Sequence, residues 1–335
     1  MKSEVVQSAV SSDNLEIPLI DFSAFTSGNK ETRLATAKAI LSGFQTAGFI
    51  YLSNHGLPKH SVKETFSKSA EFFTREQSQK DALAWTTPES NRGYVKQGRE
   101  KTTDLVDVAD IEAKRAEEGA DLKESFEIGR EGVKGHPNQW PDRFDDEAGK
   151  AFRAHMITFH EECKVLHMRV MSSIAVALGI DENYFDSFCD VGDNTLRLLH
   201  YPSVPSKVFE QNKNTVRAGS ITLLFQDMAG GLQVLSPNGN YIDATPIANT
   251  IVVNAADLLA RWSNDTIKST KHRVVQPPTR AEVHPPRYSV AYFCNPNFDA
   301  TIDAIPGTYD DGEKKKKYAS INTGEYLAQR LAATY

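Results

Sequence analysis

The sequence has little cysteine and no long apolar run, and each scarcity excludes a class of protein. Its 335 residues include three cysteines, Cys163, Cys189 and Cys294. Three thiols at wide, unequal spacing build neither a disulfide framework nor a thiolate zinc site, which fits a reducing compartment. No apolar run reaches about 18 residues and the first residues lead into polar sequence, so we expect neither a transmembrane helix nor a signal peptide. We predict a cytoplasmic protein without a membrane partner.

Positive charge is also in short supply. The chain has 38 lysines and arginines against 44 aspartates and glutamates, a formal charge of −6, and its sequence pI is about 5.9. This balance argues against a nucleic-acid partner, because binding to phosphate backbones needs excess positive charge. A basic run at residues 314–317 follows Asp310, Asp311 and Glu313, and such mixed charge indicates a solvated loop rather than a targeting signal.

The first half of the chain is predicted to be mostly helical. Residues 1–14 lack a clear period and are expected to be a disordered tail. Residues 17–21 have the apolar character of a strand, which Pro18 should confine to a sheet edge or a strand start. Apolar residues at helical spacing predict helices from Glu31 to the stop at Gly48, and over 59–73 and 146–178.

A charged segment interrupts this helical half. Residues 102–131 combine many acidic and basic side chains with scattered alanines, and their apolar face is thin. The pattern is typical of an exposed helix or a mobile insertion, and we favour the insertion.

From about Asn194 the sequence changes to short apolar or alternating runs separated by turn residues. Seven such runs occupy residues 196–201, 221–226, 232–235, 241–244, 250–254, 271–275 and 288–293. Short strands at this spacing predict a sandwich or jelly roll, and a helix near 324–332 should close the chain. We therefore expect a mainly β protein with flanking helices, made of a helical region at 15–190 and a β core at 191–335.

Two polar clusters stand out in the β region. His272 lies in an alternating segment, where a lone histidine is more often a packed core residue than a ligand. Arg287 and Ser289 share one face of the next strand, since residues two apart point the same way. A guanidinium there must reach solvent or a polar cavity, and it matches a carboxylate bidentately. A structural salt bridge is the alternative for Arg287.

Taken together, these segments resemble a known family along nearly the whole chain. It is that of the non-haem iron, 2-oxoglutarate-dependent dioxygenases, isopenicillin N synthase-like group. The matching segments, in order, are 17–21 (IPLID), 48–56 (GFIYLSNHG), 196–202 (LRLLHYP), 222–227 (TLLFQD), 230–234 (GGLQV), 254–257 (NAAD), 269–274 (STKHRV) and 287–289 (RYS). The resemblance implies a double-stranded β-helix, a jelly roll whose open end holds Fe(II) and 2-oxoglutarate.

The resemblance also implies roles for individual residues. His272 matches the family's distal iron-binding histidine, and Arg287 matches the residue that binds the far carboxylate of 2-oxoglutarate. Ser289 and Tyr201 match residues that assist at the same carboxylate. The implied partners are O2, ascorbate as reductant and a small organic substrate that is hydroxylated, desaturated or cyclised. Substrate-lining residues are expected among Arg92, Tyr94, Phe225 and Phe293.

One family motif is missing. A facial triad needs two histidines and a carboxylate, and the family supplies the first pair as His-X-Asp just before the strand that here begins at Ser220. An ungapped match puts Thr215 and Arg217 at the ligand positions, where the arginine would repel a cation. A match with a gap between Gly219 and Ser220 agrees on both sides. The chain is then about six residues short at this point.

No other part of the sequence replaces the lost pair. His160 and Glu162 lie two apart in a predicted helix, so they do not face each other, and a helix-surface position is expected for His160. Asp227 is expected to serve the turn before Gly230. His200 should point away from Tyr201, toward packed core. Two interpretations therefore stay open: an oxidoreductase of the family, or a shortened or non-catalytic relative that serves as a binding or interaction protein.

The gap predicts weak iron binding. His272 alone supplies one of the three protein ligands of a facial triad, so the chain should bind Fe(II) far more weakly than a family member with all three. Anaerobic titration with Fe(II) and 2-oxoglutarate measures this directly. A tight stoichiometric complex with charge-transfer absorption would contradict the prediction. Sequencing the transcript across Gly219–Ser220 separates the two interpretations, since an in-frame His-X-Asp segment there would favour the enzyme and its absence the non-catalytic relative.

Overall fold

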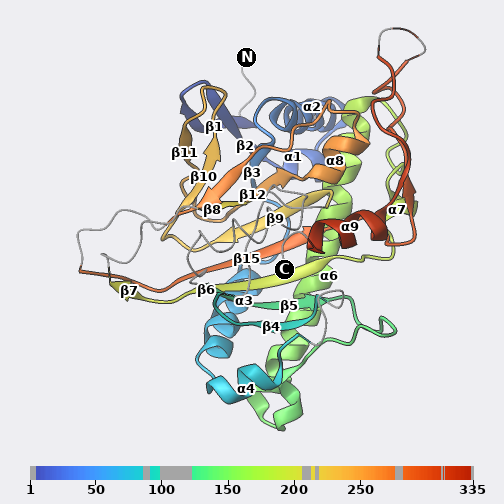
Figure 1. The fold of residues 1–335 in the computed structure, drawn as a ribbon. Coiled ribbons are helices and arrows are strands. Elements are labelled where there is room, and N and C mark those ends of the chain that lie inside the picture. Colours follow the sequence, from blue (N-terminus) through green and yellow to red (C-terminus); the bar gives the residue numbers. More distant parts are fainter. Residues whose placement is uncertain are drawn as a thin grey trace, which may run out of the picture.

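The computed structural model describes residues 5–85, 91–98, 123–205, 213–215, 219–275, 282–310, 312 and 314–332. Two β-sheets face each other, and helices cover the outer face of the larger one (Figure 1). This is the jelly-roll arrangement expected from the spacing of the strands.

The larger sheet has nine strands and carries most of the core. In spatial order they are β1 (Val6–Ser12), β2 (Leu15–Asp21), β3 (Phe49–Ser53), β12 (Thr250–Ala255), β9 (Ile221–Gln226), β15 (Arg287–Cys294), β6 (Thr195–Tyr201), β5 (Glu124–Gly129) and β4 (Gly93–Val95). Neighbours pair antiparallel except β2 with β3. Apolar side chains on both faces keep this sheet at the centre of the molecule.

A smaller sheet of four strands closes the jelly roll. Its order is β11 (Tyr241–Asp243), β10 (Leu232–Leu235), β13 (His272–Val274) and β8 (Lys213–Thr215). Val234 and Leu232 of this sheet pack with Phe49, Tyr51 and Val252 of the larger one. This second core fixes the spacing of the sheets and defines the inner face of each. Two further strand pairs, β7 (Val204–Pro205) with β14 (Val283–His284) and β16 (Thr301–Ile302) with β17 (Ile321–Asn322), lie outside these sheets.

Helices form a layer against the outer face of the larger sheet. The longest, α6 (Glu147–Leu178), runs along the sheet in Figure 1 and packs with both α2 (Lys30–Thr46) and α3 (Lys59–Phe73). Asp146 caps its first turn, and Gly179 ends it in the left-handed conformation at φ 73°. The others are α1 (Ser23–Thr26), α4 (Gln77–Ala82), η2 (Pro141–Phe144), α7 (Asp186–Cys189), α8 (Asp257–Trp262) and α9 (Thr323–Ala332). Among the described residues, no helix is long and apolar enough to cross a membrane.

Most of the predicted elements are confirmed. All seven predicted β runs form strands, and the helices predicted over 59–73, 146–178 and 324–332 are α3, α6 and α9. The N-terminal prediction was wrong. Val6–Ser12 of the expected tail forms β1, which pairs with β2 and covers its edge. Pro18 therefore lies in an interior strand, where a register shift in β1 between Ser8 and Val10 accommodates a residue that has no N–H.

The charged segment is also partly corrected. Residues 102–122 of the expected insertion lie outside the described residues. Its last part contains β5, whose six residues, Glu124 to Gly129, are all buried. Sequence pattern alone missed this strand because two of its buried side chains are glutamates.

Glu124 is tolerated in the core because three groups donate to its carboxylate. Lys80 Nζ lies 2.9 Å and Tyr94 Oη 2.5 Å from Oε2, while His200 Nδ1 lies 2.7 Å from Oε1. Burial raises the pKa of Glu124, but the hydrogen bonds from His200, Tyr94 and Lys80 outweigh it and hold the pKa below its ordinary value. This Glu124 network ties α4 to β4, β5 and β6.

Breaking the Glu124 network should cost stability in a pH-dependent way. Glu124→Gln leaves Lys80 buried without its counter-charge, so we expect a loss of about 3 kcal/mol in the free energy of unfolding at pH 7. Because the folded pKa lies below the ordinary 4.5, the stabilisation is complete above pH 4.5 and is lost as the pH falls through the folded value. Urea denaturation of both proteins at several pH values measures the difference.

A matched control is Glu64→Gln. Glu64 is exposed and lies 3.8 Å from Lys68 one helical turn away, so its loss should change stability by less than about 0.5 kcal/mol. Equal effects of the two substitutions would contradict the buried-network interpretation.

Candidate active site

The polar residues of interest gather on the inner face of the larger sheet. Along β15 this face carries Arg287, Ser289, Ala291 and Phe293, since alternate residues of a strand point the same way. The ladders place Tyr201 and Arg197 of β6 opposite Arg287 and Ala291. Beyond β6, Glu127 of β5 lies opposite Arg197. One sheet face therefore holds a row of charged and polar side chains that a packed core would exclude.

Arg287 is buried with one end of its guanidinium unpaired. The residue is 2% exposed, its Nε donates to Gly230 O at 2.6 Å, and its Cζ lies 4.7 Å from the centre of the Tyr201 ring. Its Nη1 is buried and has no hydrogen-bond partner within the described chain. A buried cationic donor left unpaired is costly, so the geometry fits an anionic ligand. The structural salt bridge considered as the alternative is not formed with any described residue.

Neighbouring groups extend this carboxylate-binding position. Ser289, which is 3% exposed, lies two residues along on the same face and pairs with Gln226 of β9 in the ladder. Gln226 Oε1 is also buried and has no partner among the described side chains and backbone. Arg287, Ser289 and Tyr201 are thus brought together as predicted, and they fit one carboxylate of 2-oxoglutarate.

His272 lies in the opposite sheet and is prepared to accept a metal. Its Nδ1 is 3.0 Å from Thr270 O, and a carbonyl only accepts, so Nδ1 carries the proton and Nε2 has the free lone pair. Burial lowers the pKa of His272, which keeps the ring neutral. The ring packs edge-on against Phe49 at 5.3 Å between centres. This is the tautomer that a ligating imidazole requires.

The rest of a metal site is not found. All nine histidines of the sequence are among the described residues, and no three histidine, cysteine or carboxylate side chains of the described chain gather as a metal site. The connection between β8 and β9, residues 216–220, contains valine, arginine, alanine, glycine and serine. None of these is a ligand that Fe(II) favours. The residues present therefore fit 2-oxoglutarate but do not fit a facial-triad iron.

The candidate replacements have other roles. Asp227 accepts from Tyr288 N at 2.6 Å and Ala229 N at 3.0 Å, so it holds the predicted turn. His200 points away from Tyr201 into the Glu124 network. His160 is 3% exposed and packs edge-on against Tyr292 at 5.0 Å, so the expected helix-surface position was wrong. Its Nδ1 lies 3.5 Å from Glu161 Oε1 and its Nε2 lies 3.4 Å from Asn194 O, so it does not pair with Glu162.

A second buried arginine marks the neighbouring part of the face. Arg197 is 1% exposed, forms an ion pair with the fully buried Glu127, and lies with its Cζ 5.4 Å from the centre of the Phe293 ring. Asn91, just before β4, donates to Thr195 Oγ1 at 3.5 Å, and its buried Oδ1 has no partner in the described chain. We call Asn91, Glu127, Arg197 and Phe293 the Arg197 wall. Sequence analysis missed Arg197, although its strand alternation gives the same signal as that of Arg287.

Two of the four predicted substrate-lining residues face the inner side. Phe293 belongs to the Arg197 wall. Arg92 is 3% exposed, and its guanidinium occupies the space over Gly129, where a Cβ would lie 1.8 Å from it. Burial lowers the pKa of Arg92 to about 10, against the attraction of Glu127, so it stays charged at neutral pH. Both therefore remain candidates.

The other two do not line this interior. Phe225 packs on Phe159 of α6 at 5.3 Å between ring centres, and Tyr94 lies against Phe72 and donates to Glu124. Both belong to the core between sheet and helices. Their positions were mispredicted because alternation decides which face a strand residue takes, and the register needed to fix it comes from the ladders.

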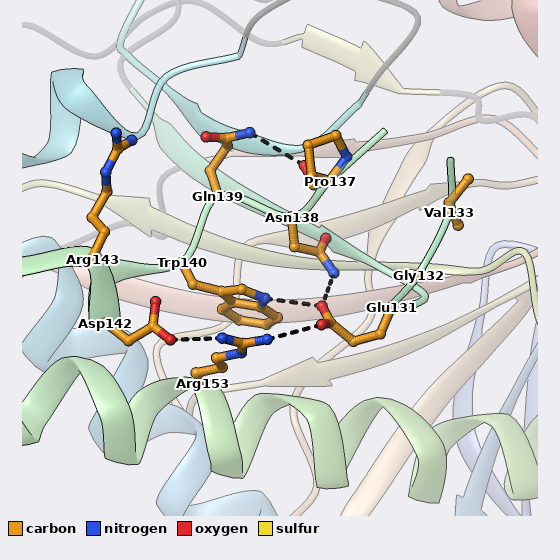
Figure 2. Close-up of a pocket in the computed structure, with 10 residues that line it drawn as sticks. All are labelled: Glu131, Gly132, Val133, Pro137, Asn138, Gln139, Trp140, Asp142, Arg143 and Arg153. Carbon is orange, nitrogen blue, oxygen red and sulfur yellow. Dashed lines mark hydrogen bonds and ion pairs between the residues drawn. The ribbon is translucent and has the colours of Figure 1, made fainter. Parts of the chain in front are cut away.

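A surface cavity of about 480 Å³ lies elsewhere, between the loop after β5 and α6 (Figure 2). Its central Arg153 pairs with Asp142 at 2.7 Å and Glu131 at 3.2 Å, and Trp140 Nε1 donates to Glu131 at 2.9 Å. These groups satisfy one another across the cavity. The side chains that line the cavity thus hold the loop after β5 in place. The inner face of the larger sheet remains the candidate site.

Comparison with known proteins agrees with this placement. The family model described as "non-haem dioxygenase in morphine synthesis N-terminal" matches residues 17–143, and that of the 2OG-Fe(II) oxygenase superfamily matches residues 192–296. A 2-oxoglutarate-Fe(II) type oxidoreductase, ppzD of Metarhizium rileyi (strain RCEF 4871), is 33% identical over 94% of this chain and 90% of its own length. The chain belongs to the 2OG-Fe(II) oxygenase superfamily. Members of this superfamily among its relatives are 2-oxoglutarate-dependent dioxygenases and hydroxylases, and the chain is by descent an oxidoreductase of this kind.

Solved structures of the superfamily match the fold as well. A full-length Neurospora crassa protein, crystallised with alpha-ketoglutarate (2-oxoglutarate) and thymine, is 58% identical over 98% of this chain and 100% of that chain, with a TM-score of 0.90. The same protein was also crystallised with 2-oxoglutarate and 5-formyluracil, at 55% identity and a TM-score of 0.87. The double-stranded β-helix expected from the resemblance is thus confirmed.

The unpaired guanidinium predicts how 2-oxoglutarate binding depends on Arg287. Replacing it by Gln removes the charge while keeping a donor, so we expect the Kd for 2-oxoglutarate to rise at least about thirtyfold. Isothermal titration calorimetry without added metal measures this. Arg261→Gln is the matched control, since Arg261 also lies 4.7 Å from a tyrosine ring and donates to a carbonyl, Ala319 O. Equal losses in both variants would mean that the effect is structural.

Proposed function

We propose that the protein acts on a pyrimidine base carrying a one-carbon group at C5, with 2-oxoglutarate as cosubstrate. The observation that carries the proposal is the Arg197 wall, which lies beside the unpaired guanidinium of Arg287 on one sheet face. Arg197 is opposite Ala291, four residues along β15 from Arg287, so the two arginines are about 13 Å apart along the strands. That spacing leaves room for a cosubstrate and a small flat substrate side by side.

The chemistry of the Arg197 wall fits a pyrimidine. A uracil ring presents carbonyl acceptors and imide N–H donors on its edge, and apolar faces above and below. Arg197 brings guanidinium N–H groups beside Glu127, Asn91 Oδ1 is an acceptor with no partner in the described chain, and Phe293 brings an aromatic ring. A buried site with polar groups of both kinds selects for a ligand that satisfies each of them.

The ligands of the Neurospora crassa protein support this substrate class. Thymine and 5-formyluracil share the same ring and differ in the oxidation of the carbon on C5. By this analogy, the reaction would convert a C5 methyl group stepwise to more oxidised forms.

The remaining parts of the proposal come from the family. In a chain with the complete metal centre, Fe(II) would be the metal, O2 the oxidant and ascorbate the reductant. The charge and cysteine content of this chain favour the cytoplasm. Oxidation needs a complete metal centre, of which this sequence carries His272. Binding of the two organic ligands needs the inner sheet face alone, so binding is the property that tests the substrate class.

The test is thymine binding by the purified chain. In the presence of 2-oxoglutarate, thymine should bind, and Phe293→Leu should weaken it about tenfold because a base stacked on an aromatic ring gains about 1–3 kcal/mol. Ligand-observed NMR titration measures both affinities. Phe298→Leu is the control, because Phe298 is 38% exposed and lies after β15. If 2-oxoglutarate binds and thymine does not, the substrate class is wrong.

A further inference from the structure

The place where the resemblance indicates missing residues follows shortly after the ladder partner of His272. In the smaller sheet, His272 is the ladder partner of Thr215, the last residue of β8. Six residues later the chain enters β9 of the larger sheet at Ile221. Ligands that share a metal with His272 would come from this connection, because it joins Thr215, the ladder partner of His272, to Ile221 of the larger sheet.

The end of this connection is firmly held. Ser220 N donates to Cys294 O at 2.8 Å, Ala256 N donates to Ser220 O at 2.9 Å, and Leu258 N donates to Gly219 O at 3.1 Å. Gly219 has φ 129°, and a Cβ on it would lie 2.9 Å from Cys294 O. The ladder therefore accepts Gly219–Ser220 as its entry without any ligand residue, and β9, which carries Gln226, stays in register with β15.

The carboxylate-binding position is independent of this junction. Arg287, Ser289 and Tyr201 are fixed by the β15–β6 ladder, and Arg287 Nε is fixed by Gly230 O. None of these contacts involves His272 or the connection from β8 to β9. The carboxylate-binding half of the site, made of Arg287, Ser289 and Tyr201, is thus complete. The cation-binding half, which contains His272, is not.

A divalent cation can chelate a 2-oxo acid but not a simple dicarboxylate. The keto oxygen and the adjacent carboxylate of 2-oxoglutarate can chelate a divalent cation together, whereas glutarate has a methylene in place of the keto group and cannot. Both acids carry the far carboxylate that would bind to Arg287. Selectivity for the keto acid therefore depends on a cation that is held by the protein.

We propose that this chain is a metal-independent receptor for short dicarboxylates, which binds 2-oxoglutarate, glutarate and succinate through Arg287 without distinguishing the keto acid. The inference rests on the cosubstrate site of the proposed function. In the family, the bound acid and a divalent cation strengthen each other's binding. In this chain we expect no such coupling, because His272 is the one metal-ligating side chain found on the cation side of the site among the described residues.

The test compares two acids in two proteins. Calorimetric titrations of 2-oxoglutarate and of glutarate are run with and without Mn(II), on the chain as it is and on a variant with a six-residue segment containing His-X-Asp inserted between Gly219 and Ser220. For the chain itself we expect the Kd values of the two acids to agree within about threefold, and Mn(II) to change neither. In the insertion variant, Mn(II) should tighten 2-oxoglutarate by about five- to 150-fold and leave glutarate unchanged, the range usual for coupled sites.

The other outcomes would contradict either the metal-independent inference or the Arg287 site on which it rests. If Mn(II) tightens 2-oxoglutarate but not glutarate in the unmodified chain, metal coupling is intact and the inference is wrong, while the cosubstrate site stands. If neither acid binds, the Arg287 site itself is wrong, and the proposed function loses its cosubstrate as well. Should the insertion variant fail to fold, electron paramagnetic resonance of Mn(II) with the unmodified chain still decides, since a bound, 2-oxoglutarate-dependent Mn(II) signal would overturn the inference.

Discussion

A buried guanidinium needs an anion, and this requirement organises the inner face of the larger sheet. Arg197 meets it within the chain, because Glu127 on the neighbouring strand is buried with it. Arg287 meets it only in part, by donating one hydrogen bond to a backbone carbonyl and stacking on Tyr201. Since removing a charge from water costs several kcal/mol, the incomplete pairing of Arg287 among the described residues fits a carboxylate ligand, while Arg197 already has its counter-charge in Glu127.

The two sheets contribute different residues to the candidate site. The larger sheet supplies Arg287, Ser289, Tyr201, Arg197 and Phe293, and its strands pack against helices on one face and against the second core on the other. The smaller sheet supplies His272, with its proton on Nδ1 fixed by Thr270. Because the metal-binding half and the carboxylate-binding half come from different sheets, one half can be lost without disturbing the other.

Sequence patterns predicted what depends on local periodicity. Spacing within one segment is enough to predict the strands of the β core and α6 with its stop at Gly179. It also predicts that Arg287 and Ser289 share one strand face. The failures involve partners that are distant in sequence. β5 was missed because its glutamates are stabilised by Lys80, His200 and Arg197, and β1 was missed because its pairing with β2 depends on a bulge opposite Pro18. Phe225 and Tyr94 were assigned to the wrong face for the related reason that strand register is set between strands.

The hydrogen bonds that hold Gly219 and Ser220 at the entry of β9 also bear on how such a chain would fare in a cell. Protein quality control responds to unfolded segments and exposed apolar surface, and chains are degraded according to how often they open. A strand entry whose backbone is hydrogen-bonded at both Gly219 and Ser220 offers neither signal. The chain would then be degraded only as often as the larger sheet itself opens.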